Sequence, residues 1–308
     1  MKKILLAVFI LSALHAVAQL PETMVYLLNV QKTPKGYNFL PPKMISKKIG
    51  YINQPYFSPD GKYLFYVSSI DSTNTEIFRI DLGNKKLKSK RITKTNEPEY
   101  SPKYTPDMSL ISCVKVEKDK TTQHFYTYNM KGKKPLNILP DMKSIGYYEW
   151  ISQNEFLSFE LPEPFYLVKH VISNNSKDTL ATHVGRTFYF LRNKSKIIYL
   201  DKTDSLHWQI RSVAADNLKK LKPKKAVENP IITETLEGEE DYCFLMDGSI
   251  LMGHNGVIYI KKNPFKNSTA KWEELLDCRK YGFDKFYRIV TNFDNTKIAL
   301  VAFKGKKP

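Results

Sequence analysis

Three features of the sequence predict an all-β fold, a six-bladed β-propeller whose last blade is closed by strands from both termini. A strand, turn, strand pattern occurs six times, at a spacing close to the length of a propeller blade. After the hairpin comes a third strand rich in aromatic residues, as in Glu76 to Asp81, with counterparts that include Pro164 to Val168 and His207 to Ile210. The sixth copy stops after its second strand, and a segment with the missing third-strand pattern stands near the N-terminus.

The clearest copy of the repeat is the segment from Gln54 to Val67. Its centre, Ser58-Pro59-Asp60-Gly61, predicts a tight turn, because proline presets φ and glycine accepts a positive φ. Aligned turns follow at Asp107-Met108, Gln153-Asn154, Asn193-Lys194, Asp247-Gly248 and Asp294-Asn295. The spacings between successive turns are 47, 46, 40, 54 and 47 residues, so we expect six units of four strands.

The two ends of the chain complete each other in this scheme. The sixth unit ends at Val301-Ala302-Phe303-Lys304, which is its second strand. Thr23 to Val30 has the apolar and aromatic pattern of a third strand, and Tyr37 to Ile45 can serve as the fourth. Closing the ring in this way removes the exposed sheet edges that an open stack of blades would leave.

The first repeat also resembles a known family. The segment Pro55 to Tyr66, followed by Glu76 to Leu82, is similar to the repeat of TolB-like, WD-type bacterial propellers, and Met246 to Met252 matches it in part. The resemblance implies a six-bladed propeller that resides in the bacterial periplasm or at the cell surface and acts mainly by binding other proteins. It implies no catalytic residues, because the family shares none.

The N-terminus reads as a secretion signal. A basic start, an apolar run from Ile4 to Leu14 and small residues at Ala16 and Ala18 predict a cleaved signal peptide over residues 1–18. Residues 19–308 are then a single propeller domain. No later segment is apolar over 18 residues, so the mature chain is expected to lack a transmembrane segment. The predicted location is the periplasm or the cell surface.

The net charge of +17 suits an anionic partner, and the alternative is a lysine-rich genome, since lysine far outnumbers arginine. In a propeller, hairpin turns and third-to-fourth loops share one face, while second-to-third loops and blade crossings share the other. Basic residues concentrate in the predicted third-to-fourth loops, at residues 85–91, 131–134, 219–225 and 261–271. We therefore predict a basic face suited to an anionic protein, lipopolysaccharide or cell-wall surface. No nucleic-acid partner is predicted, because the chain has no binding motif of that class.

Residues at the blade crossings are the candidates for a binding site, because the crossings face the mouth of the central channel. The candidates are Tyr51, Tyr147, His183, Arg186, Glu239, Glu240, Asp241 and Tyr281. Arg186 is a candidate carboxylate ligand, and the alternative is an arginine that braces two blades. The aromatic residues suit protein or sugar recognition, and the alternative is a wedge between blades.

The consecutive acids Glu239, Glu240 and Asp241 are a candidate set of oxygen ligands for calcium. No D-x-D-x-D-G loop accompanies them, and an exposed acidic loop is the alternative. No cofactor and no metal site are therefore predicted.

Enzymatic motifs are missing from the sequence. It has no H-E-x-x-H, no G-x-S-x-G and no phosphate-binding glycine loop. Its three cysteines, Cys113, Cys243 and Cys278, are too far apart to suggest a metal site or a disulfide framework. The favoured function is a non-catalytic exported module that binds a protein partner, as a component of a cell-envelope complex at the periplasm or outer membrane. The alternative is a metal-dependent lactonase or esterase with its site at the channel mouth.

Overall fold

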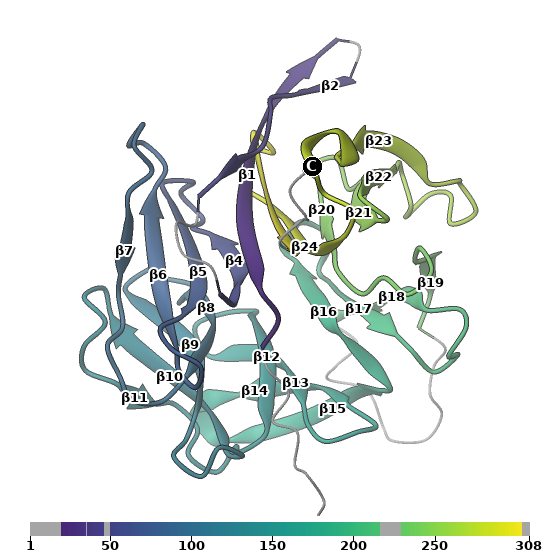
Figure 1. The fold of residues 1–308 in the computed structure, drawn as a ribbon. Helices are drawn as coiled ribbons and strands as arrows, with labels where there is room; N and C mark the ends of the chain where they lie inside the picture. The colour runs from purple at the N-terminus through teal and green to yellow at the C-terminus, as the bar shows by residue number, and fades with distance from the viewer. Residues whose placement is uncertain (1–19, 35, 46–49, 216–228, 304–308) are drawn as a thin grey trace, which may run out of the picture.

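A computed structural model describes residues 20–34, 36–45, 50–215 and 229–303. In it, six antiparallel sheets surround a central axis, so the protein is an all-β, six-bladed propeller (Figure 1). The predicted fold class is confirmed. The predicted signal peptide and the lysines at 219–225 lie outside the described residues. Among the described residues, no helix has the length and apolar character needed to cross a membrane.

The blades are numbered in chain order, starting from the first sheet whose strands are all consecutive. Blade 1 contains β4 (Ile52–Phe57), β5 (Tyr63–Ser69), β6 (Thr75–Asp81) and β7 (Ser89–Arg91). Blade 2 contains β8 (Glu99–Tyr104), β9 (Leu110–Val116), β10 (Gln123–Asn129) and β11 (Leu136–Asn137). Blade 3 contains β12 (Ile145–Trp150), β13 (Glu155–Glu160), β14 (Tyr166–Val171) and β15 (Ser176–Thr182).

The remaining blades continue the order. Blade 4 contains β16 (Val184–Leu191), β17 (Lys196–Asp201), β18 (Gln209–Ala214) and β19 (Ile231–Glu234). Blade 5 contains β20 (Tyr242–Phe244), β21 (Ile250–His254), β22 (Val257–Lys261) and β23 (Glu273–Asp277). Blade 6 contains β24 (Phe286–Thr291), β25 (Lys297–Phe303), β1 (Thr23–Thr33), β2 (Gly36–Phe39) and β3 (Lys43–Met44). Short 3-10 helices are η1 (Ile172–Asn174), η2 (Arg192–Lys194) and η4 (Arg279–Tyr281).

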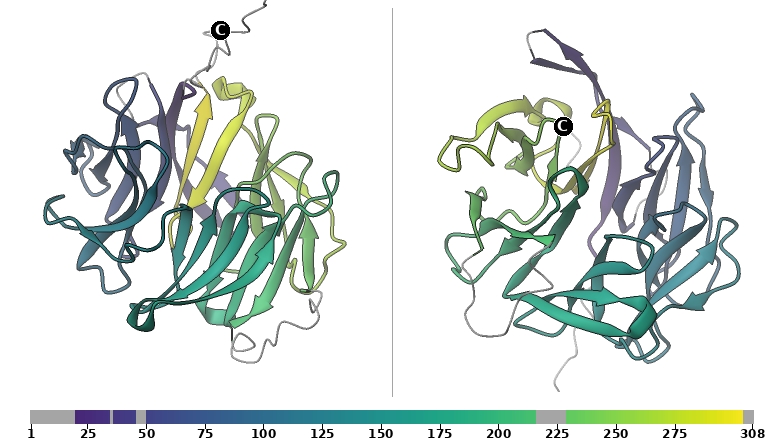
Figure 2. Two further views of the ribbon diagram at one scale, coloured as in Figure 1. Left: turned by 90° about the horizontal axis from the view of Figure 1, so that it is seen from below. Right: turned by 180° about the vertical axis from the view of Figure 1, so that it is seen from behind.

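Blade 6 joins the two ends of the chain, as the sequence predicts. β1 pairs antiparallel with β25 over seven residues, in a register that places Tyr26 opposite Leu300. The N-terminal strand therefore lies beside the last strand, purple next to yellow in both ribbon views (Figures 1 and 2). Val25 and Leu28 of β1 are fully buried, so the closing strand contributes to the core as well as to the sheet.

The hairpin turns are held by short side chains, which explains why the turn pattern repeats. In blade 1 the Ser58 hydroxyl donates to Asp60 at 2.6 Å and accepts from the amide of Tyr63 at 2.8 Å. Thr105 and Asp107 repeat this arrangement in blade 2. Asp and Ser or Thr side chains that bond to nearby amides favour turns over continued strand.

Apolar clusters fill the spaces between blades. One of them joins Phe65 and Ile77 of blade 1 to Tyr104 and Ile111 of blade 2. A fully buried aliphatic or aromatic side chain contributes roughly 1.5–3 kcal/mol relative to exposure. The inter-blade contacts therefore supply much of the stability of the ring.

Two third strands begin later than the sequence suggests. β14 begins at Tyr166 instead of Pro164, and proline has no N–H to donate to a sheet. β18 begins at Gln209 instead of His207. The carboxylate of Asp204 accepts the amides of Leu206 and His207, which keeps that segment in a turn.

The predicted basic loops are mostly exposed where the structure describes them. Lys85, Lys86 and Lys131 are exposed, whereas Lys261 is buried. Four turn aspartates, Asp60, Asp107, Asp247 and Asp294, share this face with the lysines. The net charge of the face stays a prediction.

Candidate functional site

The first strands of the six blades, β4, β8, β12, β16, β20 and β24, surround a cavity of about 300 Å³ on the central axis. These strands run from the blade crossings toward the hairpin turns, so the cavity lining has one layer near each end. The layer near the crossings contains most of the charge. We call this group the crossing layer: Tyr147, Arg186, Asp241 and Arg288 of the lining, together with Asn53, which bonds to Arg288.

Breaks in strand pairing point these side chains at the axis. The pairing register shifts between Ile145 and Tyr147 and between Phe286 and Arg288. A bulge inserts an extra residue and re-aims the next side chain. The longest shift precedes Phe188 and contains Gly185, where an added Cβ would come within 2.4 Å of Leu200. The absence of a side chain at Gly185 thus lets β16 approach β17 closely, and this backbone path directs Arg186 toward the channel axis.

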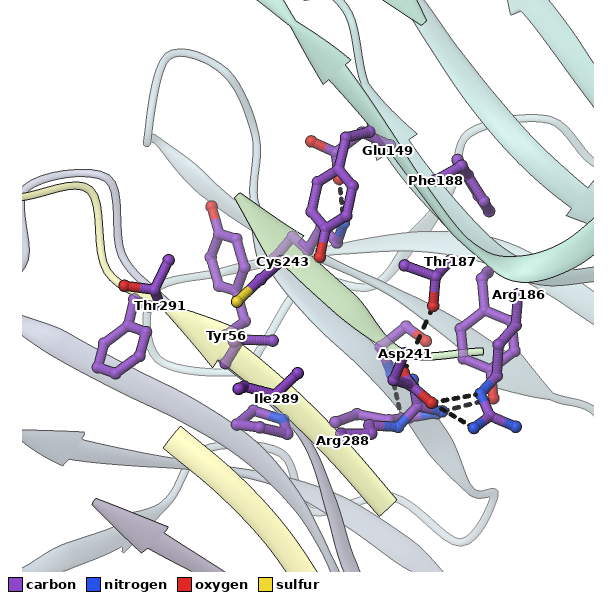
Figure 3. Close-up of a pocket in the computed structure, with 18 of the residues that line it drawn as sticks. Tyr56, Glu149, Arg186, Thr187, Phe188, Asp241, Cys243, Arg288, Ile289 and Thr291 are labelled. Carbon is purple, nitrogen blue, oxygen red and sulfur yellow. Dashed lines mark hydrogen bonds and ion pairs between the residues drawn. The ribbon is translucent and has the colours of Figure 1, made fainter. Parts of the chain in front are cut away.

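Asp241 is the centre of the crossing layer. Its Oδ2 accepts from Arg186, with Nε at 3.1 Å and Nη2 closer still, and its Oδ1 accepts from Arg288 Nη1 at 3.2 Å. Thr187 adds a 3.4 Å contact from its hydroxyl to Oδ1. Figure 3 shows both guanidinium groups directed at this one carboxylate.

Arg288 spans the channel. Nε donates to Asn53 at 2.8 Å, Nη1 to Asp241, and Nη2 to the Tyr147 hydroxyl at 2.8 Å. These partners belong to the first, fifth and third blades, while Arg288 itself belongs to the sixth. Burial lowers the pKa of Arg288, but the electrostatic interactions with Tyr147 and Asp241 raise it by more, so the pKa lies above its usual value. All three nitrogens are occupied, so Arg288 joins four blades.

Arg186 makes a similar bridge between neighbouring blades 4 and 5. Besides Asp241, it contacts Glu240 at 3.6 Å, and its guanidinium lies 5.1 Å from the ring centroid of Tyr287. Burial opposes the charge, yet Asp241 and Glu240 raise the pKa of Arg186 above its usual value. The arginine is therefore a cation throughout the physiological pH range.

The structure brings only some of the predicted mouth residues together. Tyr147, Arg186 and Asp241 line the cavity. Tyr51 is buried behind them, where burial raises its pKa.

The other candidates lie elsewhere. His183 is exposed, and its ring bonds to the adjacent Thr182 at 3.1 Å. Tyr281 packs against the apolar cluster of blades 5 and 6. Glu239 and Glu240 are outside the cavity lining.

The three consecutive acids do not form an oxygen cage for calcium. Glu239 bonds to His254 at 3.1 Å, Glu240 to Lys202 at 2.5 Å, and Asp241 to the two arginines. Because each carboxylate already faces a basic side chain, these residues do not fit a calcium ion. Within the described ranges, no group of three or more His, Cys, Asp or Glu side chains is arranged to hold a metal.

The layer nearer the hairpin turns is more apolar and contains one ion pair. Lys103 of β8 pairs with Glu149 of β12, beneath the ring of Tyr148. Cys243 also lines the cavity, where complete burial raises its thiol pKa far above the usual value. A thiol in that state is a poor nucleophile.

Sequence reasoning missed Arg288, although the repeat contains the signal that finds it. The residues six positions before each aligned turn are Gln54, Ser101, Tyr147, Thr187, Asp241 and Arg288. All six line the cavity. Neighbours among them bond directly, as the amide of Ser101 does to Gln54 Oε1 at 2.7 Å. Comparing this one position across the six repeats would therefore have identified these six cavity-lining residues from the sequence.

Comparison with solved structures finds the same fold. A protein from Agrobacterium tumefaciens assigned as TolB superposes with a TM-score of 0.66 and 12% identity, over 93% of this chain and 99% of that one. TolB from Acinetobacter baumannii gives a TM-score of 0.58 and 14% identity, over 92% of this chain and 65% of that one.

An oligogalacturonate lyase in complex with manganese gives a TM-score of 0.52 and 10% identity, over 94% of this chain and 80% of that one. No protein-family profile matches the sequence. No curated protein matches it either. The resemblance to TolB-like propellers is thus confirmed in the fold.

Proposed function

We propose that this protein is a non-catalytic, exported propeller that binds a protein partner over the face formed by its hairpin turns. The TolB-like fold supports an interaction role. The crossing layer supports the choice of face, because its arginines and Asp241 bond to one another across the channel. That end of the channel acts as an internal brace.

One observation carries the proposal: two large apolar side chains stand exposed on adjacent hairpin turns. Met246, in the turn of blade 5, is 61% exposed, and Phe293, in the turn of blade 6, is 74% exposed. The turns are joined by a hydrogen bond of 2.6 Å from the Met246 amide to Asn295 Oδ1. Exposed apolar groups that the fold holds in place, with a polar surround, are typical of protein interaction sites.

The surround of this patch is basic in part. Lys194 lies 4.8 Å from the ring centroid of Phe265, and Phe265 borders the turn of blade 5 at Gly248. The exposed loop lysines at 85–88 and 131–134 occupy the same face. We therefore infer a partner surface with an apolar centre and acidic margins, within a complex of the bacterial cell envelope. The predicted signal peptide supports a periplasmic or surface location.

The hydrolase alternative draws no support from the channel. The carboxylates near its crossing end are paired with basic side chains. The solved lyase in complex with manganese shares the fold alone.

Affinity capture from solubilised envelopes, with identification by mass spectrometry, tests the proposal. We expect the wild-type protein to retain a specific partner that the double variant Met246→Ser, Phe293→Ser loses. Leu206→Ser is the matched control, because Leu206 is 79% exposed but lies in the β17 to β18 loop on the opposite face. Equal capture by all three proteins would reject the hairpin-turn face. Separately, recovery of the chain in the cytoplasm with residues 1–18 intact would reject export.

A further inference from the structure

A buried group of oxygen atoms lies between blades 1 and 2, away from the channel. It involves Asn74, which precedes β6, Glu76 within β6, and Glu99, the first residue of β8. All three side chains bond to one residue of the crossing between the blades, Thr95. Asn74 Nδ2 donates to the Thr95 carbonyl at 2.9 Å, the Thr95 amide donates to Glu76 Oε1 at 2.8 Å, and the Thr95 hydroxyl donates to Glu99 Oε1 at 2.5 Å.

The hydrogen bonds leave one oxygen of each side chain without a partner. Glu76 Oε1 also accepts from Arg91 at 2.7 Å, and Glu99 Oε1 also accepts from the Tyr128 hydroxyl at 3.0 Å. Among the described residues, Glu76 Oε2, Glu99 Oε2 and Asn74 Oδ1 are buried and have no hydrogen-bond partner. The Thr93 hydroxyl accepts the Ile77 amide at 2.9 Å, and it also lies near enough to the Glu99 carboxylate to favour its charged form. Both glutamates are 0% exposed. Buried carboxylate oxygens normally have hydrogen-bond partners, because a buried acceptor without one loses its interaction with water and gains nothing in return.

The charges in this group do not balance either. In the part of the chain that the structure describes, Arg91 is the only basic side chain bonded to the two glutamates, so ionised Glu76 and Glu99 leave one uncompensated negative charge. A fully buried, unpaired charge is strongly unfavourable. A small cation that binds the bare oxygens would remove both deficits at once.

We propose that Glu76, Glu99 and Asn74 form a binding site for a calcium ion between blades 1 and 2. Calcium binds carboxylate and amide oxygens at 2.3–2.6 Å with flexible geometry. Three side-chain oxygens fall short of its usual six to eight, so main-chain carbonyls and water complete the shell. Magnesium is a poorer fit, because it keeps several waters and requires near-octahedral geometry. The donor set contains neither histidine nor thiolate, which argues against zinc.

The position explains what the ion does and how it enters. Asn74 and Thr95 are half-buried and stand next to the exposed residues Thr73 and Asn96, so the site is near solvent. Its ligands come from two blades, because Glu76 belongs to β6 and Glu99 to β8. Calcium therefore links these two blades and stabilises the folded ring.

Isothermal titration of chelator-treated mature protein with calcium chloride tests the site directly. We expect one calcium ion per chain, and a rise of several degrees in the unfolding temperature that millimolar magnesium does not reproduce. Glu99→Gln, which keeps the shape of the side chain, should weaken calcium binding at least tenfold. Asn74→Ala, at a half-buried position, should also weaken binding while far-UV circular dichroism remains unchanged.

Glu240→Gln is the matched control, because Glu240 belongs to the acidic crossing between blades 4 and 5 and should leave calcium binding unchanged. Absence of calcium binding to the wild type would overturn the proposal. So would binding that survives Glu99→Gln and Asn74→Ala, and so would binding that only Glu240→Gln removes. A loss of partner capture without loss of calcium binding would leave this inference standing, since the two sites are separate.

Discussion

Asp241 and Glu99 are two carboxylates at the start of innermost strands, and each lies at a junction between blades. Asp241 meets two guanidinium groups, and both of its oxygens accept hydrogen bonds. Glu99 Oε1 accepts from two hydroxyl groups, and the Thr93 side chain lies near the carboxylate, but among the described residues no hydrogen bond reaches Oε2. Both oxygens of the Asp241 carboxylate are therefore satisfied, whereas Glu99 keeps one buried oxygen for the calcium ion proposed above. Charge compensation, more than burial, separates the two.

The largest expected effect on stability comes from removing the guanidinium group of Arg288, which bonds to three other blades inside the channel. Arg288→Ala removes a buried guanidinium that donates to Asp241, Asn53 and Tyr147 together, so we expect a loss of about 3–5 kcal/mol in the free energy of unfolding. Urea denaturation followed by tryptophan fluorescence measures it. Lys262→Ala is the control, because Lys262 and Glu273 form an exposed pair worth under about 1 kcal/mol. If the two variants lose the same stability, the channel network is not a brace.

Neutralising each carboxylate without changing its shape should give effects of opposite sign. Asp241→Asn weakens the bonds to both arginines and leaves them partly uncompensated, so we expect a loss of about 2 kcal/mol. Glu99→Gln, measured in the presence of a chelator, removes an unfavourable buried charge and should therefore raise the free energy of unfolding at pH 8. A variant Asp241→Asn as stable as the wild type would contradict the assigned difference.

The smallest effect is the pH dependence contributed by Glu99 when calcium is removed. Burial is the main cause that raises the pKa of Glu99 to about 7, and the charge of Glu76 adds to it. The unfolded chain has an ordinary glutamate pKa of about 4.3, so the folded state binds more protons between the two values and stability falls as the pH rises through 7.

Between pH 6 and pH 8 this amounts to about 1 kcal/mol, lost by the wild type relative to Glu99→Gln. The difference in unfolding free energy between the two proteins, measured at both pH values in a chelator, checks it. A difference that does not change with pH would show that Glu99 ionises normally in the fold.

Most of the fold was predictable from the sequence, because the repeat encodes it locally. The turn residues Ser58 and Asp60 form the hydrogen bonds that their types suggest. The segment from Thr23 to Val30 was identified as the closing strand from its pattern alone, and it pairs with β25. Strand starts were less predictable where a side chain binds the backbone, as Asp204 does before β18.

The candidate site was less predictable, since it depends on contacts between distant residues. Arg186 and Asp241 were both singled out, but their bond joins residues 55 positions apart. Arg288 reaches Asn53 across 235 positions, and no local pattern announces such a contact. The bare oxygens of Glu76 and Glu99 appear only once every hydrogen bond around them has been counted.

The closure of blade 6 also constrains the order in which the protein is made. Among the described strands, β1 is made first and its partner β25 is made last. Blades 1 to 5 have all their strands before that, whereas the edge of β1 that pairs with β25 stays unpaired until β25 has been made. A chain stalled or truncated before Lys297 would therefore remain an open arc with that edge exposed to other nascent chains and to proteases.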